Sequence, residues 1–273
     1  MTMRSFSISS GKARMTGLED GEGPAVVFLH AGVADKRMWR DQMAAFADRY
    51  RVVAYDRRGF GETRYEPDSF SHIHDLRAVL DGLGIEQACL VGCSQGGRFS
   101  VDFALAHPQR VSKLVLVAPA ISGAPQPKPD DLPPDIAALP EQVEQAEDQK
   151  HFDLVNRIEA HMWLDGPRSV DGRVQGSARD LFLHMNIIPL KSPSPGKDEA
   201  AANSFERLEE IVAPTLIIWG DLDFPHVQQR CILLGKRIKG AKTEMMPGTA
   251  HLPNLEQPKK FNALLQAFLS DAR

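Results

Sequence analysis

The chain has 273 residues, 42% of them hydrophobic and 25% charged, and 32 basic against 36 acidic side chains give a formal net charge of −4. At about 150 residues per domain, this length fits one large α/β domain with an insertion, or two small domains. The charge balance offers no basic footprint for nucleic acid or an anionic membrane surface, so we expect neither as a partner. No apolar run approaches the roughly 20 residues of a membrane helix.

The cysteines and the first residues of the chain indicate in which cellular compartment the protein is expected. The chain starts without an apolar segment that leads to a small-residue cleavage site, so we expect no secretory signal. Three cysteines, Cys89, Cys93 and Cys231, are too few, and odd in number, for a disulfide scaffold. Cys89 and Cys93 fall in one expected strand, too far apart to pair. Together these features predict a cytoplasmic protein.

The first half of the chain alternates between strand and helix patterns. Polar, alternating residues over Phe6–Thr16 predict an antiparallel hairpin at the edge of a sheet. The apolar runs that follow are short and nearly continuous, which is typical of parallel strands covered on both faces. Their alternation with helical patterns indicates repeated βαβ units. We expect strands over Ala25–His30, Arg51–Asp56, Ala88–Cys93 and Val111–Ala118, and helices near Trp39–Asp48, Ser71–Leu83 and Gly97–Ala106.

After the fourth of these strands the pattern changes. Prolines crowd into residues 119–140, and helical patterns follow to about Leu164 and over Gly176–Met185. The strand–helix alternation resumes at Thr215–Gly220 and again around Lys242–Met246. The sequence therefore predicts an α/β core formed by residues 1–120 and 211–273, interrupted by a helical insertion over residues 121–210.

The strongest chemical signal is the segment Gly92-Cys93-Ser94-Gln95-Gly96, which follows an expected strand and opens an expected helix. This is the context of a nucleophile elbow, in which a serine sits on a strained turn between small residues. Gly92 and Gly96 supply those small residues. The helix that starts here directs free N–H groups and the positive end of its dipole toward the turn. We therefore identify Ser94 as the candidate nucleophile.

A serine hydroxyl is a weak nucleophile and needs a general base that is itself oriented by an acid. Asp223 follows the strand expected at Thr215–Gly220, and His251 follows the last expected strand. Because open α/β sheets bind ligands at the carboxyl ends of their strands, these positions predict a triad of Ser94, Asp223 and His251. Asp221 lies in the same turn, but Asp223 is farther from the strand tip and is the preferred acid. We expect Asp221 to be a turn or cap residue.

Acyl transfer also needs donors for the developing oxyanion. The backbone N–H of Gln95, directly after the nucleophile, is one candidate. The second is expected from the loop after Leu29, where Gly32 is preferred because a glycine lets the backbone approach a substrate closely. Val33 is the alternative donor.

Five segments together resemble the α/β-hydrolase superfamily, in the capped branch of carboxylesterases, enol-lactonases and carbon–carbon bond hydrolases. They are Phe28–Gly32, Asp56–Gly61, Gly92–Gly97, Trp219–Asp223 and Gly248–His251. The resemblance implies a mostly parallel, eight-stranded α/β sheet flanked by helices, with the insertion as a helical cap. The chain departs from the family pattern at Ala31, where a His-Gly pair is commoner, and this leaves the second oxyanion donor open. Relatives that open epoxides or displace halide use Asp at the elbow, so Ser94 argues against those activities.

The resemblance further implies a serine hydrolase that cleaves a small carboxylic ester or lactone through an acyl-enzyme, without metal or cofactor. We expect the cap to shape the substrate pocket and to exclude water. Five side chains are candidates for lining that pocket: Val33, Trp163, Phe182, Met185 and Leu252. The alternative for the aromatic and methionine residues of the insertion is that they pack the cap helices against the core.

Three other functions fit the same fold and triad. A carbon–carbon bond hydrolase of ring-cleavage products would need a site for a dienoate carboxylate, for which Arg57, Arg98 and Arg179 are candidates. A cofactor-free perhydrolase or haloperoxidase would use the same triad, and a ligand receptor would retain it with little turnover. Each implies a small-molecule partner, and a homo-oligomer is compatible with all of them. The pair His72 and His74 faces different directions on a helix, so we expect no metal site there.

Overall fold

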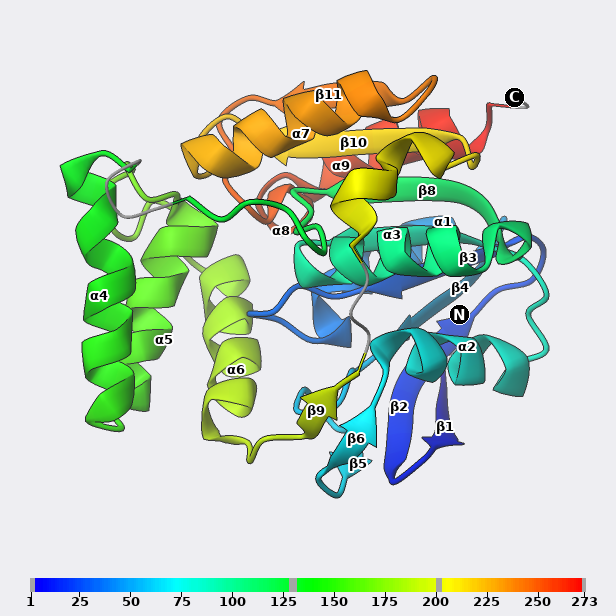
Figure 1. Ribbon diagram of the computed structural model, residues 1–273, viewed down its shortest axis with the longest axis horizontal. Helices are drawn as coiled ribbons and strands as arrows, with labels where there is room; N and C mark the ends of the chain where they lie inside the picture. Colours follow the sequence, from blue (N-terminus) through cyan, green and yellow to red (C-terminus); the bar gives the residue numbers. More distant parts are fainter. Residues whose placement is uncertain (1–2, 128–131, 200–202, 272–273) are drawn as a thin grey trace.

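A nine-stranded, mostly parallel sheet runs through the centre of the molecule (Figure 1). The structure is a computed structural model that describes residues 3–127, 132–199 and 203–271. The strands of this sheet are β1 (Arg4–Ser10), β2 (Ala13–Asp20), β3 (Ala25–Leu29), β4 (Arg51–Tyr55), β5 (Arg64–Tyr65), β7 (Ala88–Cys93), β8 (Val111–Val117), β10 (Thr215–Gly220) and β11 (Lys242–Met246).

The strand order is β1-β2-β4-β3-β7-β8-β10-β11, with the two-residue β5 paired to β2. β1, β2 and β4 pair antiparallel, whereas β4, β3, β7, β8, β10 and β11 pair parallel with their neighbours. The predicted edge hairpin and the predicted parallel core are therefore both confirmed. Eight strands form the main path, as expected, and β5 is an addition that the sequence pattern does not reveal.

Helices cover both faces of the sheet because the parallel strands are apolar on both sides. Side chains of one face, such as Val27, pack with α2 (His72–Gly82), α3 (Gln95–Ala106) and α7 (Pro225–Arg237). The alternate side chains, such as Phe28, pack with α1 (Arg40–Phe46) and α9 (Pro258–Leu269). Four short helices are also present: η1 (Lys36–Trp39), η2 (Pro108–Arg110), η5 (Ser204–Glu210) and α8 (Pro253–Glu256). None of the described helices combines the length and apolarity needed to cross a membrane.

Three longer helices lie in sequence between β8 and β10, within residues 121–210. They are α4 (Pro134–Asp148), α5 (Phe152–Ala160), which continues into the π-helical turn η4 (His161–Asp165), and α6 (Ser177–Lys191). In Figure 1 they stand together at the left, on the side toward which the arrow of β10 points. A second small sheet, in which β6 (Asp68–Phe70) pairs parallel with β9 (Gly196–Asp198), ties the end of this segment to the core.

The helix boundaries differ from the sequence expectation at two places. α3 begins at Gln95 and not at Gly97, since the elbow turn leads directly into the helix. α6 continues past Met185 to Lys191 and includes Pro189 in its last turn. A proline is expected to end a helix, but here the chain closes with a hydrogen bond from Ser192 N to the Pro189 carbonyl (3.2 Å).

Candidate active site

Ser94 lies on a strained turn between β7 and α3. Its backbone has φ 52° and ψ −115°, a conformation that non-glycine residues rarely adopt. The turn is held by Ser94 N donating to Val117 O (2.9 Å) and by Ala120 N donating to Ser94 O (3.0 Å). A Cβ at Gly92 would lie 2.4 Å from Gly96 O, and one at Gly96 would lie 2.2 Å from Leu29 O. The glycines are therefore required by the close approach of the surrounding backbone.

His251 and Asp223 meet at the carboxyl ends of neighbouring strands. Nδ1 of His251 lies 2.7 Å from Oδ2 of Asp223, and both side chains are buried. The other carboxylate oxygen of Asp223 accepts a hydrogen bond from Phe224 N (2.7 Å), which fixes the carboxylate plane. Asp221 is exposed and accepts from Gly248 N (2.7 Å). The structure thus brings Asp223, and not Asp221, to the imidazole.

The other side of His251 is covered by the helical segment. The ring of Trp163, in η4, lies 4.7 Å from the His251 ring, and Trp163 O accepts from His251 N (3.3 Å). Trp163 also packs on Phe224, next to the acid, at 4.9 Å between ring centroids. Among the described residues, no hydrogen bond joins the Ser94 hydroxyl to His251. Such contacts are often long before substrate binds.

The loop after β3 approaches the elbow from the opposite side. A Cβ at Gly32 would lie 2.6 Å from Nε2 of Gln95, so the two residues are in direct contact. Gln95 is exposed, and Gly32 and Val33 are half-buried. Within the described residues, the backbone N–H groups of these three positions have no hydrogen-bond acceptor. They are available to a negatively charged oxygen beside Ser94.

Residues 24–258 match the family model of the alpha/beta hydrolase fold. The chain belongs to this family. The match spans both parts of the predicted core together with the insertion, and it agrees with the strand order and the elbow geometry described above.

Three relatives cover most of this hydrolase. The putative 2-succinyl-6-hydroxy-2,4-cyclohexadiene-1-carboxylate synthase of Bacillus subtilis is 29% identical over 275 residues, covering 91% of this chain and 93% of the relative. The 2-hydroxy-6-oxo-6-phenylhexa-2,4-dienoate hydrolase of Comamonas testosteroni is 28% identical over 262 residues, covering 92% and 89%. Carboxylesterase YbfK of B. subtilis is 25% identical over 267 residues, covering 95% and 84%. In its crystal structure YbfK aligns with all of this chain and 93% of its own at a TM-score of 0.77, with 22% identity.

The residues predicted to line a substrate pocket separate into two groups. Val33 and Trp163 are half-buried, and the Trp163 ring lies against that of His251. Val33 directly follows Gly32, which contacts Gln95. Phe182, Met185 and Leu252 are 0% exposed, so their side chains pack in the interior of the hydrolase and do not face an open cavity. They belong to one apolar cluster that joins the helical segment to the core.

A buried guanidinium lies directly beneath the elbow. Arg57 is 2% exposed and donates from Nη1 to Oε1 of Gln95 (3.1 Å) and from Nη2 to Ala31 O (3.2 Å). Its guanidinium carbon lies 4.5 Å from the centre of the Phe60 ring and 5.0 Å from that of Phe99. Burial lowers the pKa of Arg57, but a guanidinium stays protonated at neutral pH. The guanidinium therefore forms hydrogen bonds to both segments that would bind an oxyanion, the one at Gln95 and the loop after β3.

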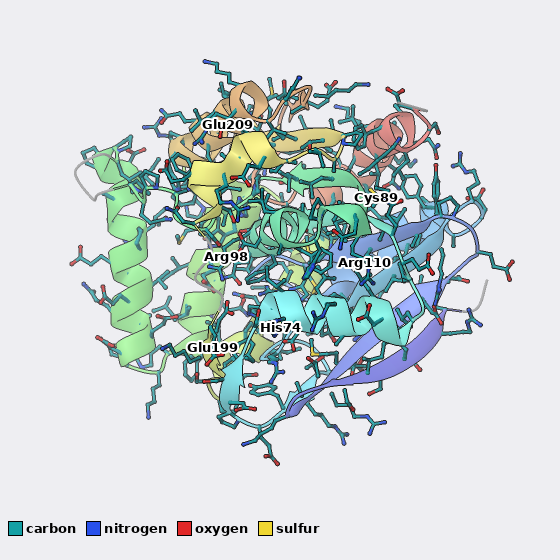
Figure 2. All side chains as sticks on the ribbon, turned by 45° about the vertical axis from the view of Figure 1, so that its right-hand side comes forward. His74, Cys89, Arg98, Arg110, Glu199 and Glu209 are labelled. Atoms are coloured by element: carbon teal, nitrogen blue, oxygen red, sulfur yellow. The ribbon has the colours of Figure 1, made fainter. Side chains whose placement is uncertain are left out.

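The other two candidate arginines lie in different surroundings. Arg98, labelled in Figure 2, lies in the first turn of α3 and is partly exposed. Its Nη2 lies 3.6 Å from Oδ2 of Asp198. Arg179 forms ion pairs with Asp165 (2.7 Å) and Asp171 (2.9 Å). Its guanidinium is thus already matched by two carboxylates within the helical segment.

One group of side chains in the described residues has the spacing of metal ligands: His161, Asp165 and Asp171. Asp165 accepts hydrogen bonds from Gly172 N (2.9 Å) and Val174 N (2.8 Å) in addition to its pair with Arg179. The Arg179 guanidinium already supplies the positive charge there, so this group is better described as an ion-pair network than as a cation site.

Glu256 was not singled out from the sequence, although it lies close to the candidate base. Its Oε1 accepts from Ala250 N (2.7 Å), next to His251, and its Oε2 pairs with Arg173 of the helical segment. Burial raises the pKa of Glu256 to about 7. No pattern around Glu256 distinguishes it from a helix-start carboxylate, so only the fold reveals this contact.

Two buried histidines make the fold sensitive to acid. Burial, together with the nearby Arg57, holds the pKa of His30 and His72 well below the usual 6.5. The unfolded chain takes up these protons below about pH 6.5 whereas the native state does not, so stability is lost as the pH falls below that value. Each histidine should contribute about 1.4 kcal/mol of that loss per pH unit.

The variant His72→Phe is therefore expected to remove one such contribution. The centre of the His72 ring lies 4.1 Å from that of Phe99, and its Nδ1 has no hydrogen-bond partner among the described residues, so phenylalanine suits the site. Urea unfolding at about pH 7.5 and 5.5 measures the free energy of unfolding, and the drop should be smaller than in the wild type by about 1.4 kcal/mol. His74→Phe, at an exposed position of α2 labelled in Figure 2, is the matched control and should leave the drop unchanged. Equal drops in all three proteins would refute the assignment.

Proposed function

We propose that this protein is a serine hydrolase that cleaves small carboxylic esters or lactones through an acyl-enzyme. The observation that carries the proposal is the combination of the strained Ser94 turn with a buried His251–Asp223 pair at the same edge of the sheet. A strained turn persists only where the surrounding structure holds it, and such strain clusters at reactive sites.

The proposed reaction has two halves, acylation of Ser94 and hydrolysis of the acyl-enzyme, and the same groups act in both. Ser94 Oγ attacks the substrate carbonyl while Nε2 of His251 takes the hydroxyl proton, and Asp223 holds Nδ1 and stabilises the imidazolium. The carbonyl oxygen becomes an oxyanion facing the N–H of Gln95 and of Gly32 or Val33. Collapse expels the alcohol, which receives the proton from His251 and leaves Ser94 acylated. Water then attacks the acyl-enzyme while His251 takes its proton. The bond between the acyl carbon and Ser94 Oγ breaks, His251 returns the proton to Oγ, and the carboxylic acid is released.

The helices α4, α5 and α6 act in this proposal as a cap over the reacting groups. Trp163 supports this role of the helices, because it belongs to the helical segment and its ring lies against that of His251, the proposed base. A cap at this position excludes water from the oxyanion and shapes the acyl site. We place the core at residues 1–120 and 211–273 and the cap at 121–210.

The test is initial-rate hydrolysis of p-nitrophenyl esters from acetate to decanoate, combined with diethyl p-nitrophenyl phosphate as an active-site label. We expect turnover with an optimum at short or medium chain length. We also expect stoichiometric inactivation, with the phosphoryl mass on the peptide that contains Ser94. Absence of ester turnover by folded protein, or a label on another residue, would overturn the proposal.

Cleavage of a carbon–carbon bond is a second candidate. It is favoured by the similarity to the dienoate hydrolase of C. testosteroni and by two positive side chains at the elbow, Arg57 and Arg98. Of these only Arg98 is exposed enough to meet a substrate carboxylate. Decay of the absorbance of a ring-fission dienoate measures this activity, and a kcat/KM above that for every p-nitrophenyl ester would make it the main reaction.

Arg57 is expected to act as a positioning residue in either reaction. In Arg57→Met, the Gln95 side chain and the Ala31 carbonyl lose their shared donor, so both oxyanion segments shift. We expect kcat to fall by about 10²-fold with KM little changed, as when one oxyanion donor is lost. Arg57→Lys keeps the charge but cannot bridge both segments, and it should recover only part of the rate. A change in KM as large as the change in kcat, or a wild-type kcat in Arg57→Lys, would contradict this role.

A further inference from the structure

Arg173 forms a bridge between the helical segment and the loop after β11. It lies in the chain that leads from η4 to α6, and its side chain is 25% exposed. Its guanidinium donates from Nε to Asp165 O (2.6 Å), from Nη1 to Gly248 O (3.1 Å) and from Nη2 to Leu164 O (2.9 Å). Nη2 also pairs with the carboxylate of Glu256. Four of the five N–H groups of the guanidinium are therefore used, two toward the helical segment and two toward the core.

The end of η4 needs these donors. The last carbonyls of a helix have no partner within the helix itself. The chain turns away at Gly166 (φ 94°), and Arg173 supplies N–H groups to the carbonyls of Leu164 and Asp165. A Cβ at Gly166 would lie 2.4 Å from Leu222 O, so this end of the turn also contacts the loop after β10. The end of η4 therefore rests on the two loops that carry the proposed acid and the proposed base.

Glu256 connects the bridge to the backbone of His251. Its side chain is 3% exposed, and its Oε1 accepts from Ala250 N (2.7 Å). The next backbone N–H, that of His251, donates to Trp163 O (3.3 Å). Two consecutive N–H groups at the proposed base are therefore held, one by the carboxylate that pairs with Arg173 and one by the turn whose end Arg173 caps.

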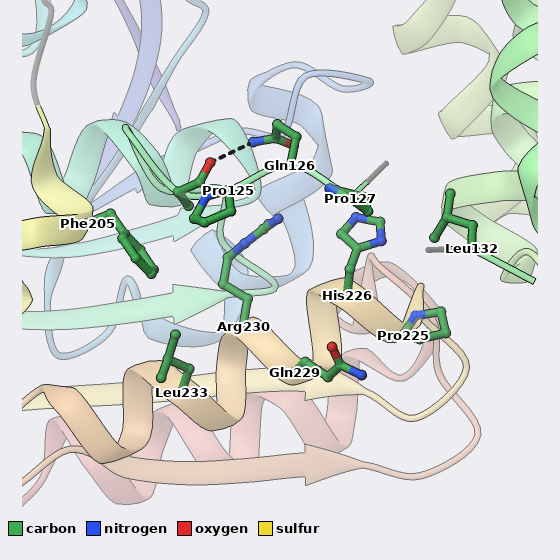
Figure 3. A pocket seen from close by; sticks show the side chains of 11 residues that line it. Pro125, Gln126, Pro127, Leu132, Phe205, Pro225, His226, Gln229, Arg230 and Leu233 are labelled. Atoms are coloured by element: carbon green, nitrogen blue, oxygen red, sulfur yellow. Dashed lines mark hydrogen bonds between the residues drawn. The ribbon is translucent and has the colours of Figure 1, made fainter. Parts of the chain in front are cut away.

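The rings around Trp163 depend on the same turn. The indole contacts the rings of His251 (4.7 Å between centroids) and Phe224 (4.9 Å). Phe224 packs in turn on His226 (5.4 Å), which lines the cavity between α7 and the loop after β8 shown in Figure 3. This stack keeps the indole against the imidazole only while the backbone of η4 stays in place.

We propose that Arg173 is a positioning residue for His251. It holds η4 and the loop after β11 in one arrangement, so that the imidazole stays where its Nε2 can take the proton of Ser94. Arg173 does not touch the substrate and acts through the His251 backbone and the Trp163 ring. A displacement of about 1 Å at a reacting group can lower a rate by about 10²-fold, so a residue with this role has a measurable effect on kcat. The inference rests on the proposed ester hydrolysis.

The kinetic test compares Arg173→Met and Arg173→Lys in the whole protein. Methionine removes every donor, and lysine keeps the charge but cannot reach all four acceptors. In Arg173→Met we expect kcat for the best p-nitrophenyl ester and the rate of Ser94 labelling by diethyl p-nitrophenyl phosphate to fall together by about tenfold or more, with KM little changed. Arg173→Lys should recover only part of both rates.

Arg51→Met is the matched control. The Arg51 side chain is 26% exposed and pairs with Glu19 (2.8 Å) at the amino end of β4, away from the loops that carry the proposed triad. Its loss removes a similar ion pair and should leave kcat and the labelling rate unchanged.

A double variant covers the case in which Arg173→Met does not fold because the buried Glu256 carboxylate has lost its partner. Arg173→Met combined with Glu256→Gln removes both charges, and the amide oxygen can still accept from Ala250 N. We expect the same joint fall of kcat and labelling rate in this variant.

A measurement that needs no turnover is the imidazole resonance of His251, assigned with His251→Gln. The ring current of the Trp163 indole displaces this resonance, and Trp163→Leu gives its position without the indole. We expect Arg173→Met, or the double variant, to move the resonance toward that position, and Arg51→Met to leave it in place. An unchanged resonance, a wild-type kcat without Arg173, or an equal loss of kcat in Arg51→Met would each overturn the proposal. If the wild type turned over no ester, the proposed function would fail, and the resonance would still decide whether Arg173 holds the imidazole.

Discussion

Replacing Ser94 by alanine is expected to lower kcat for p-nitrophenyl ester hydrolysis by about 10⁶-fold. In the proposed reaction the substitution removes the atom that forms the acyl-enzyme, and it leaves the His251–Asp223 pair without a nucleophile to activate. The oxyanion donors remain, so a small residual rate above that in water should persist. Initial rates at saturating ester, with single-turnover measurements of p-nitrophenol release, give this value.

Ser100→Ala is the matched control for that loss. Ser100 lies in α3, directly after the elbow turn, and is buried; its one hydrogen bond to the described residues goes to the Gly96 carbonyl (2.8 Å). Its removal deletes a hydrogen bond worth about 1 kcal/mol of stability and should leave kcat near the wild-type value. A cooperative thermal melting curve would show that Ser94→Ala is folded. If this folded variant retained more than about 1% of the ester turnover, the reaction would not proceed through a Ser94 acyl-enzyme.

The sequence was informative about the candidate active site because the geometry that brings these residues together is local or dictated by topology. The elbow requires glycines at fixed spacing from Ser94, and those positions are visible in five residues. The approach of Asp223 to His251 follows from parallel pairing of β10 with β11, since neighbouring parallel strands end at the same edge. Neither inference needed knowledge of how distant helices pack.

Other features depend on contacts that no local pattern encodes. Arg57 and Gln95 are far apart in sequence, and their hydrogen bond exists only because β4 and β7 both pair with β3. Trp163 reaches His251 through a π-helical turn, which the helical periodicity of the insertion does not predict. Phe182 and Met185 were predicted as pocket candidates from residue type alone, and tertiary packing buries them.

The second large effect on kcat is expected at Asp223, the carboxylate that contacts His251, and not at its neighbour Asp221. Asp223→Asn is expected to lower kcat by about 10⁴-fold, because a neutral amide does not stabilise the imidazolium. Its oxygen keeps the hydrogen bond from Phe224 N, so its NH2 group faces Nδ1 of His251 and holds the unproductive tautomer. Asp221→Asn makes the same chemical change two positions away. Within the described part of the chain, this side chain accepts one hydrogen bond, from Gly248 N in a turn. Its asparagine oxygen still accepts that bond, so kcat should stay within about twofold of wild type.

The pair of variants separates a catalytic acid from a residue that merely shapes the loop. If the turn between β10 and α7 were the sensitive element, both substitutions would lower activity together with the thermal midpoint. If Asp223 acts through the imidazole, kcat falls in Asp223→Asn alone, KM changes little, and diethyl p-nitrophenyl phosphate labels Ser94 more slowly. A larger loss in Asp221→Asn than in Asp223→Asn would reassign the acid. Retention of the label rate in Asp223→Asn would show that Ser94 is activated without this carboxylate.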